Sequence, residues 1–157
     1  MDEALFFDDV SVDHIRIYVN DLELASLTLG EKYGLASCHF DLPACPLETE
    51  RSRCFSKEDI CIVLTQPLVQ SHPGSEFLRR HGEGVADIAF EVSDATQAFS
   101  LAVLRGALPH QAPQQKDGIV SASIFGAGDL VHTFVQRVTS RHRRSLENNT
   151  PGRMVNG

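Results

Sequence analysis

Residues 12–25, VDHIRIYVNDLELA, and residues 85–98, VADIAFEVSDATQA, are two copies of one pattern. In both copies apolar and polar side chains first alternate, which is typical of a strand, and an Asp then precedes apolar residues at helical spacing. The copies stand at a constant offset of 73 residues, from Val12 to Val85. The sequence therefore predicts a strand followed by a helix, repeated once, and this repeat decides the fold.

Each copy also predicts where its helix begins and ends, and which strands follow it. The expected caps and stops are Asn20 or Asp21 with Gly34 in the first helix, and Ser93 or Asp94 with Gly106 in the second. The strands expected after the helices cover residues 36–41, 51–57 and 59–65 in the first copy and 108–112, 118–126 and 129–137 in the second. Between the copies, Pro and Gly residues mark a linker with a short helix at 75–80, capped by Ser75.

These elements predict an α+β fold made of two tandem βαβββ modules. A module with one bare sheet face is not stable alone, so the two are expected to form one cupped mixed sheet around a cavity, with the helices on the outer face. The expected organisation is a single domain over 10–137, with module 1 at 10–66, a linker at 67–83, module 2 at 84–137, and a polar tail at 138–157.

Composition narrows the class of protein. The chain has 157 residues and a net charge of −7, with a sequence pI of about 5.4, so it lacks the basic footprint of a nucleic-acid-binding domain. No apolar run approaches the ~18 residues of a membrane helix, and the acidic N-terminus does not resemble a signal peptide. We therefore expect a cytoplasmic protein that binds neither nucleic acid nor membrane and keeps its four cysteines as reduced thiols.

The repeat brings polar side chains to the inner face of the sheet. His14 in the first copy and Asp87 in the second occupy equivalent positions, so the sequence predicts that they face each other across the cup. The pair either joins the modules by a hydrogen bond or holds a divalent ion. Arg16 is expected either to bind an anionic ligand or to pair with Glu91 or Asp87, and Tyr18 to contact an aromatic one.

Several motifs resemble a known family. The stretches VDHIRIYVNDLELA, DICIVLTQPL, SEFLRRHGEGVADIAFEVSDATQAF and GDLVHTFVQR are similar to the N-terminal half of 4-hydroxyphenylpyruvate dioxygenase and 4-hydroxymandelate synthase. These enzymes are members of the vicinal oxygen chelate superfamily, with glyoxalase I, bleomycin-resistance proteins and extradiol dioxygenases. The resemblance runs from Val10 to Arg137.

The resemblance implies four metal-ligand positions, which fall on His14, Val63, Asp87 and Thr133. It also implies that iron in these dioxygenases sits in the C-terminal half, held by two histidines and a glutamate. Here only His14 and Asp87 are strong donors, so the iron triad is incomplete and no cofactor is firmly expected. Fe(II) or another divalent metal would need further ligands from a substrate or a second chain.

The resemblance leads us to expect a metabolic enzyme, of the oxidoreductase type, that acts on an aromatic or 2-oxo-acid-like metabolite in the cup. His14 is the expected general base or ligand and Asp87 the group that orients it. The expected substrate-binding residues are Arg16, Tyr18, Cys61, Glu91 and Thr133, although the sequence favours a small buried side chain as the role of Cys61. Two alternatives stay open: a binding protein of the resistance type, or a metal-free half that pairs with an iron-bearing half. A homodimer is expected.

Overall fold

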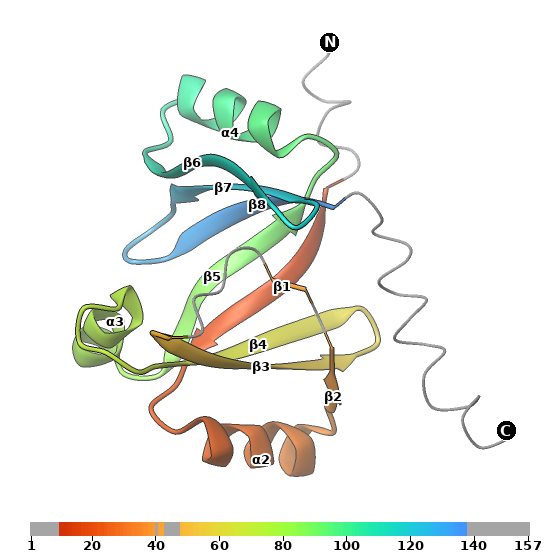
Figure 1. Ribbon diagram of the computed structural model, residues 1–157, viewed down its shortest axis with the longest axis vertical. Helices are drawn as coiled ribbons and strands as arrows, with labels where there is room; N and C mark the ends of the chain where they lie inside the picture. Colours follow the sequence, from red (N-terminus) through yellow and green to blue (C-terminus); the bar gives the residue numbers. More distant parts are fainter. Residues whose placement is uncertain (1–9, 40, 43–47, 138–157) are drawn as a thin grey trace, which may run out of the picture.

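The computed structural model describes residues 10–39, 41–42 and 48–137 (Figure 1). The tail expected at 138–157 lies outside the described residues. The elements follow one another as β1 (Ser11–Tyr18), α2 (Leu22–Tyr33), β2 (Ala36–Cys38), β3 (Glu50–Lys57), β4 (Ile60–Pro67), α3 (Pro73–His81), β5 (Gly84–Glu91), α4 (Ala95–Leu104), β6 (Pro109–Lys116), β7 (Ile119–Phe125) and β8 (Val131–Arg137).

The strands form one mixed sheet in the order β2-β3-β4-β1-β5-β8-β7-β6. The first strands of the two modules, β1 and β5, meet antiparallel at its centre, and each runs parallel to the last strand of its own module. Module 1 therefore makes one half of the sheet and module 2 the other. This arrangement confirms the α+β fold with two βαβββ modules in one mixed sheet.

The repeat holds at the level of single residues. Ser11 opens β1 and Gly84 opens β5, the same 73-residue offset as in the sequence. Asp21 caps α2 by accepting a hydrogen bond from the backbone of Leu24, and Asp94 caps α4 by accepting one from Gln97. Of the alternative caps expected from the sequence, the two aspartates are therefore the ones used.

Each module has its own apolar core between its helix and the outer face of the sheet. In module 1, Leu22 of α2 packs with Val19, Phe55 and Leu64. In module 2, Ala95 and Ala98 of α4 pack with Val92 and Phe134. Since side chains alternate along a strand, the residues between these core positions point to the opposite, inner face. Both helices thus cover the outer face and leave the inner face for the site (Figure 1).

The linker helix begins earlier than expected. α3 starts at Pro73, and its N-cap is His72 rather than Ser75. Proline is favoured in the first helical turn because its missing N–H has no partner there in any helix. The His72 ring takes the cap role, since its Nδ1 accepts a hydrogen bond of 2.8 Å from the backbone N–H of Gly74.

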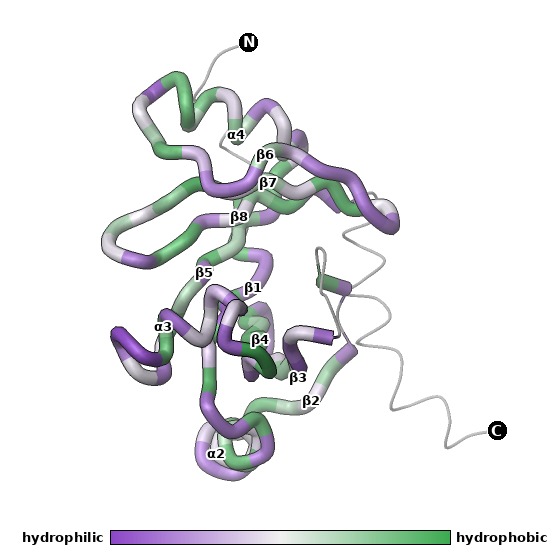
Figure 2. Tube along the Cα trace, turned by 60° about the vertical axis from the view of Figure 1, so that its left-hand side comes forward, coloured by the Kyte–Doolittle hydropathy of each residue, from purple (hydrophilic) through white to green (hydrophobic). Residues whose placement is uncertain are grey.

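The two outer strands also differ from expectation. β2 ends at Cys38, three residues before the predicted end, and β6 runs to Lys116, beyond the predicted end at 112. β6 contains two prolines, which are tolerated because an outer strand has one side without ladder partners. Figure 2 shows β6 as a mostly hydrophilic segment, as expected for a strand at the edge of a sheet.

None of the helices in the described part of the chain combines the length and the apolar character that crossing a membrane requires.

Candidate functional site

A hollow of about 550 Å³ lies on the inner face, where the two modules meet. β1 contributes three consecutive inward side chains to its wall, His14, Arg16 and Tyr18. Asp87 on β5 and Thr133 on β8 contribute from module 2. Five of the seven residues expected at the site therefore do line one hollow.

The strand register corrects the expected opposition of His14 and Asp87. Ala89 lies opposite His14, and Asp87 lies opposite Arg16. Two antiparallel strands run in opposite directions, so a residue meets its own repeat equivalent only at the centre of the pair, and here that pair is Ile15 with Ile88. His14 and Asp87 line the same hollow from positions displaced to either side of this centre.

His14 is oriented by its neighbour Asp13. The β1–β5 register shifts between Val12 and His14, and this bulge lets Asp13 and His14 both be buried. The Nδ1 of His14 lies 2.7 Å from Oδ2 of Asp13. An ionised carboxylate only accepts hydrogen bonds, so Nδ1 carries the proton and donates it. A bulge of this kind leaves no mark in the alternation of the sequence.

Arg137 at the end of β8 completes this cluster. It donates two hydrogen bonds to Asp13, of 2.9 and 3.1 Å, and the Asp13 side chain is fully buried. Burial alone would raise the pKa of Asp13, but hydrogen bonds from His14 and Arg137 outweigh it and hold that pKa well below its usual range. Asp13 is therefore a carboxylate at neutral pH, and it connects β1 of module 1 to β8 of module 2.

Asp87 is held by Thr133. Its two carboxylate oxygens accept hydrogen bonds from the Thr133 hydroxyl at 2.5 Å and from the Thr133 backbone N–H at 3.2 Å. The hydroxyl proton is directed at Asp87, so Thr133 acts as a support for the carboxylate on the wall of the hollow. Both residues were expected here, but their mutual contact was not.

Arg16 is anchored at one nitrogen. Its Nη1 donates to the hydroxyl of Thr65 at 2.5 Å and lies 3.6 Å from Oε2 of Glu50. Within the described part of the chain, Nε and Nη2 of Arg16 make no hydrogen bond to another residue. The pairing expected with Glu91 or Asp87 is thus replaced by one with Glu50, and the Arg16 side chain, which lines the hollow, keeps further N–H donors.

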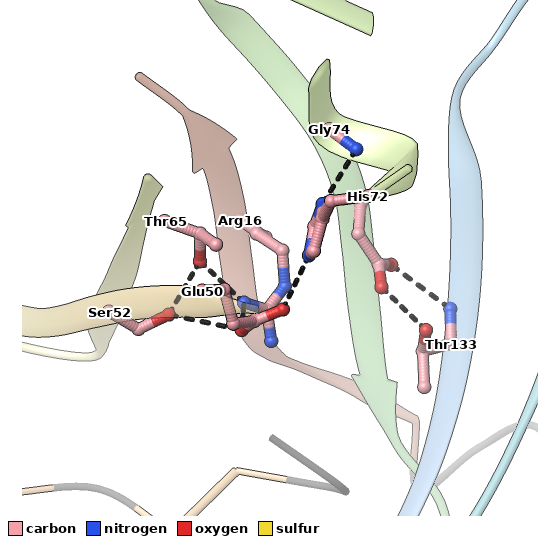
Figure 3. A network of polar contacts seen from close by, with 8 residues as sticks. Arg16, Glu50, Ser52, Thr65, His72, Gly74 and Thr133 are labelled. Carbon is pink, nitrogen blue, oxygen red and sulfur yellow. Dashed lines mark hydrogen bonds and ion pairs between the residues drawn. The ribbon is translucent and has the colours of Figure 1, made fainter. Parts of the chain in front are cut away.

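Glu50 and His72 form a buried pair that sequence reasoning missed. Oε1 of Glu50 lies 2.7 Å from Nε2 of His72. Because Nδ1 of His72 already accepts from Gly74, the ring proton sits on Nε2 and is donated to Glu50. Figure 3 shows Arg16, Glu50 and His72 in one continuous chain of contacts. The only signal for His72 was its place before Pro-Gly, where helices often begin.

Tyr18 forms an aromatic wall with the linker helix. Its ring centroid lies 5.7 Å from that of His72 and 5.5 Å from that of Phe77. Burial raises the pKa of the Tyr18 hydroxyl, and the nearby charge of Arg16 opposes this in part. The side chain therefore offers a neutral hydroxyl and a ring face to whatever occupies the hollow.

Two expected residues lie away from the hollow. The described residues that line the hollow do not include Cys61 or Glu91. Cys61 is buried on β4 opposite Ser56, and Glu91 lies opposite Ser11 near the end of β5. Alternation places both side chains on the inner face, but the hollow does not extend along the whole strand. Alternation predicts the face of the sheet and not the position along the strand.

The donor set does not fit a metal ion. Of the four ligand positions that the resemblance implied, Val63 is a fully buried hydrocarbon, and the hydroxyl of Thr133 donates to Asp87. Within the described residues, no group of three or more His, Cys, Asp or Glu side chains is arranged to hold a metal. We therefore assign no chemical step to a metal bound by these residues.

A mixed sheet of two βαβββ modules, cupped around a hollow lined by both first strands, is the glyoxalase-type fold, and together with the family match it places the chain in the vicinal oxygen chelate superfamily. Within it, the chain belongs to the family described as hydroxyphenylpyruvate dioxygenase, N-terminal, whose family model matches residues 51–147.

Curated relatives agree with this family. A 4-hydroxyphenylpyruvate dioxygenase of Dictyostelium discoideum is 28% identical over 135 residues, which cover 80% of this chain and 36% of the relative. One of Coccidioides posadasii is 28% identical over 142 residues, covering 80% of this chain and 36% of the relative. The chain thus spans about a third of the length of these relatives.

Solved structures show the same fold. A mutant of 4-hydroxymandelate synthase from Streptomyces coelicolor matches with a TM-score of 0.70 at 28% identity, over 82% of this chain and 38% of that one. Methylmalonyl-CoA epimerase from Mycobacterium tuberculosis matches with a TM-score of 0.68 at 21% identity, over 81% of this chain and 87% of that one. At this identity the second match concerns the fold alone.

Proposed function

We propose that the hollow binds a small aromatic or 2-oxo-acid-like metabolite and that Arg16 holds its carboxylate. The observation that carries this proposal is the guanidinium of Arg16. It is largely buried, it is fixed at Nη1 by Thr65 and Glu50, and it keeps Nε and Nη2 without acceptors among the described residues. Guanidinium groups with two adjacent donors suit planar carboxylates.

The size and the wall of the hollow support the same ligand class. A volume of about 550 Å³ is within the range of small-molecule sites, roughly 300–1,000 Å³. Tyr18, Phe77 and Phe125 line it, and aromatic rings pack well against another aromatic ring. The proposed ligand therefore has a ring at one end and an acid at the other.

Titration calorimetry with 4-hydroxyphenylpyruvate tests the binding. We expect binding by the wild type and an affinity at least tenfold lower for Arg16→Gln, since a charge-assisted pair is lost. The matched control is Arg79→Gln, because Arg79 is exposed on α3 and outside the hollow. The methyl ester of the ligand, which lacks the negative charge, should bind both proteins equally. Equal affinity of the acid for wild type and Arg16→Gln would refute the anchor.

The catalytic role of His14 and Asp87 is part of this proposal. Both line the hollow, and the hydrogen bond to Asp13 holds a ring proton of His14 on Nδ1. Nε2 is therefore the ring nitrogen that would accept a proton from a ligand. His14 would take a proton from the carbon next to the ligand's carbonyl, and Asp87 would contact the same part of the ligand. In D2O, the wild type should then exchange the CH2 hydrogens of 4-hydroxyphenylpyruvate faster than His14→Gln or Asp87→Asn. His81→Gln, which changes an exposed histidine outside the hollow, should exchange like wild type.

A second candidate is a metal-free half that works with an iron-bearing half. Two observations favour it: the chain spans 36% of the length of its curated relatives, and its donor set does not fit iron. The oxidoreductase activity would then belong to the assembled protein. Oxygen consumption with 4-hydroxyphenylpyruvate and ferrous iron should be absent for this chain alone. Iron-dependent consumption by the isolated chain would contradict this candidate.

A homodimer and a cytoplasmic location complete the proposal. Large apolar side chains are exposed on both outer helices, with Leu24 and Leu27 on α2 and Leu104 at the end of α4. Burying such side chains is a common reason for self-association. Light scattering at tens of micromolar should give twice the chain mass, and a monomer would contradict the dimer. Cell fractionation tests the location.

A further inference from the structure

Three cysteines that lie on different strands are brought to one region of the sheet. Cys38 lies on β2, Cys54 on β3 and Cys61 on β4, which are neighbouring strands. All three are reduced thiols in the structure. None of them is among the described residues that line the hollow, so this cluster is separate from the proposed binding site.

The strand register selects one pair within the cluster. Cys38 and Cys54 are direct partners in the antiparallel β2–β3 ladder. Directly opposite residues in such a ladder have Cα atoms about 4.5 or 5.5 Å apart, within the roughly 4.4–6.8 Å that a disulfide requires. Cys61 lies opposite Ser56 and is only diagonal to Cys54, at about 7–8 Å. Only the first pair can be bridged without moving the backbone.

Both members of the pair lie on the same face and remain open to reagents. Phe55, the residue after Cys54, points into the core under α2, so Cys54 points to the inner face, and Cys38 shares that face. Cys38 and Cys54 are each partly exposed, whereas Cys61 is buried. A thiol that is to react needs such access.

We propose that Cys38 and Cys54 form a redox-reactive pair that closes to a cross-strand disulfide on reaction with a small disulfide such as glutathione disulfide. One thiolate attacks a sulfur of the reagent and forms a mixed disulfide, which releases one glutathione thiol. The second cysteine thiolate then attacks the bound cysteine sulfur and releases the other glutathione. The protein loses two hydrogens as two electrons and two protons, and the glutathione disulfide is reduced to two thiols.

The bond would join the outer strand β2 to β3. It would lie in the row of ladder partners that crosses the sheet to Arg16 in the proposed binding site. Cys54 is the ladder partner of Val63, and Val63 is the partner of Arg16. Two strand spacings, roughly 10 Å, separate Cys54 from Arg16, and Cys38 lies one strand further out. Oxidation would therefore tie β2 to β3, two strands from the proposed ligand anchor, without occupying the hollow.

The test uses the folded full chain, treated with glutathione disulfide without denaturant, alkylated, and analysed by intact mass and peptide mapping. We expect the wild type to lose two hydrogens and to give a Cys38–Cys54 linked peptide, reversible by dithiothreitol. Cys38→Ser and Cys54→Ser should each abolish this product. The other two cysteines of the sequence, Cys45 and Cys61, supply the matched controls, because Cys45→Ser and Cys61→Ser should each retain it.

Thermal unfolding gives a second, independent readout. Oxidised wild type should unfold at a temperature higher by on the order of 5 °C than the reduced protein, because the bond restricts the unfolded chain. Cys54→Ser should show no such shift. A linkage through Cys45 or Cys61, only mixed glutathione adducts, or no reaction would overturn the proposal. If a serine variant does not fold, the linked peptide of the wild type decides. None of these results depends on ligand binding in the hollow.

Discussion

Asp13 on β1 and Arg137 at the end of β8 are joined by two hydrogen bonds of 2.9 and 3.1 Å, although 124 positions separate them in the chain. The Asp13 side chain is fully buried, and that of Arg137 is 6% exposed. The pair links the first strand of one module to the last strand of the other. It also sets the orientation of His14, which lines the hollow.

Replacing Asp13 by Asn should strongly destabilise the fold. The change removes the counter-charge that Arg137 and His14 contact while keeping the side-chain shape. Breaking a buried ion pair from one side costs about 3–5 kcal/mol, and we expect a loss of that order in the free energy of unfolding, measured in urea. The control is Glu76→Gln, which breaks the exposed pair with Arg79 and should change the stability little. Equal effects of the two substitutions would contradict a buried ion pair.

The same pair predicts how stability depends on acid. The pKa of Asp13 is lower in the folded protein than the ~3.9 of an unfolded Asp, so its contribution is fully present above that value. The contribution is lost as the pH falls through the folded-state pKa. Urea unfolding measured between neutral pH and about pH 2.5 should therefore show a steeper loss in wild type than in Asp13→Asn below about pH 4. A constant difference between the two proteins across this range would count against the prediction.

Tyr18 should ionise at a higher pH than an ordinary tyrosine. Burial raises its pKa above the usual value of ~10, so the stability that it contributes is present below pH 10 and declines as the pH rises through the folded-state value. Tyr33 is the only other tyrosine, so Tyr33→Phe leaves a single phenolate signal in the near ultraviolet. Arg16→Gln in this background should raise the Tyr18 pKa further, since the Arg16 charge lowers it. A fall on this substitution would show that the two side chains do not interact.

Gly74 should not tolerate a side chain. A Cβ at this position would lie 2.7 Å from the Tyr18 ring and 2.7 Å from Cγ of Pro67, so α3 would have to move. We expect Gly74→Ala to destabilise the protein by about 1–3 kcal/mol. Gly30→Ala in α2 is the control of opposite sign, because its Cβ would meet only the Leu35 carbonyl at 3.9 Å and alanine favours a helix by about 0.5–1 kcal/mol. Thermal unfolding of both variants checks the two signs.

Most of the fold could be predicted from the sequence because its signals are local. The alternation around Ile15 and Ile88, and the caps at Asp21 and Asp94, each depend on a few neighbouring residues. The repeat then implied that the two modules are equivalent and share one sheet. The errors were also local: His72 caps α3 through a ring nitrogen, a role that sequence rules give to Ser, Thr, Asp and Asn.

The sequence by itself determined the two βαβββ modules, the inward set of His14, Arg16 and Tyr18, and the family to which the chain is similar. The tertiary structure alone decided which of those side chains contact each other. Alternation alone decides which side chains of a strand share a face, whereas their contacts depend on register, strand direction and bulges. The antiparallel β1–β5 pair therefore set Asp87 opposite Arg16, and the bulge at Asp13 gave His14 its partner.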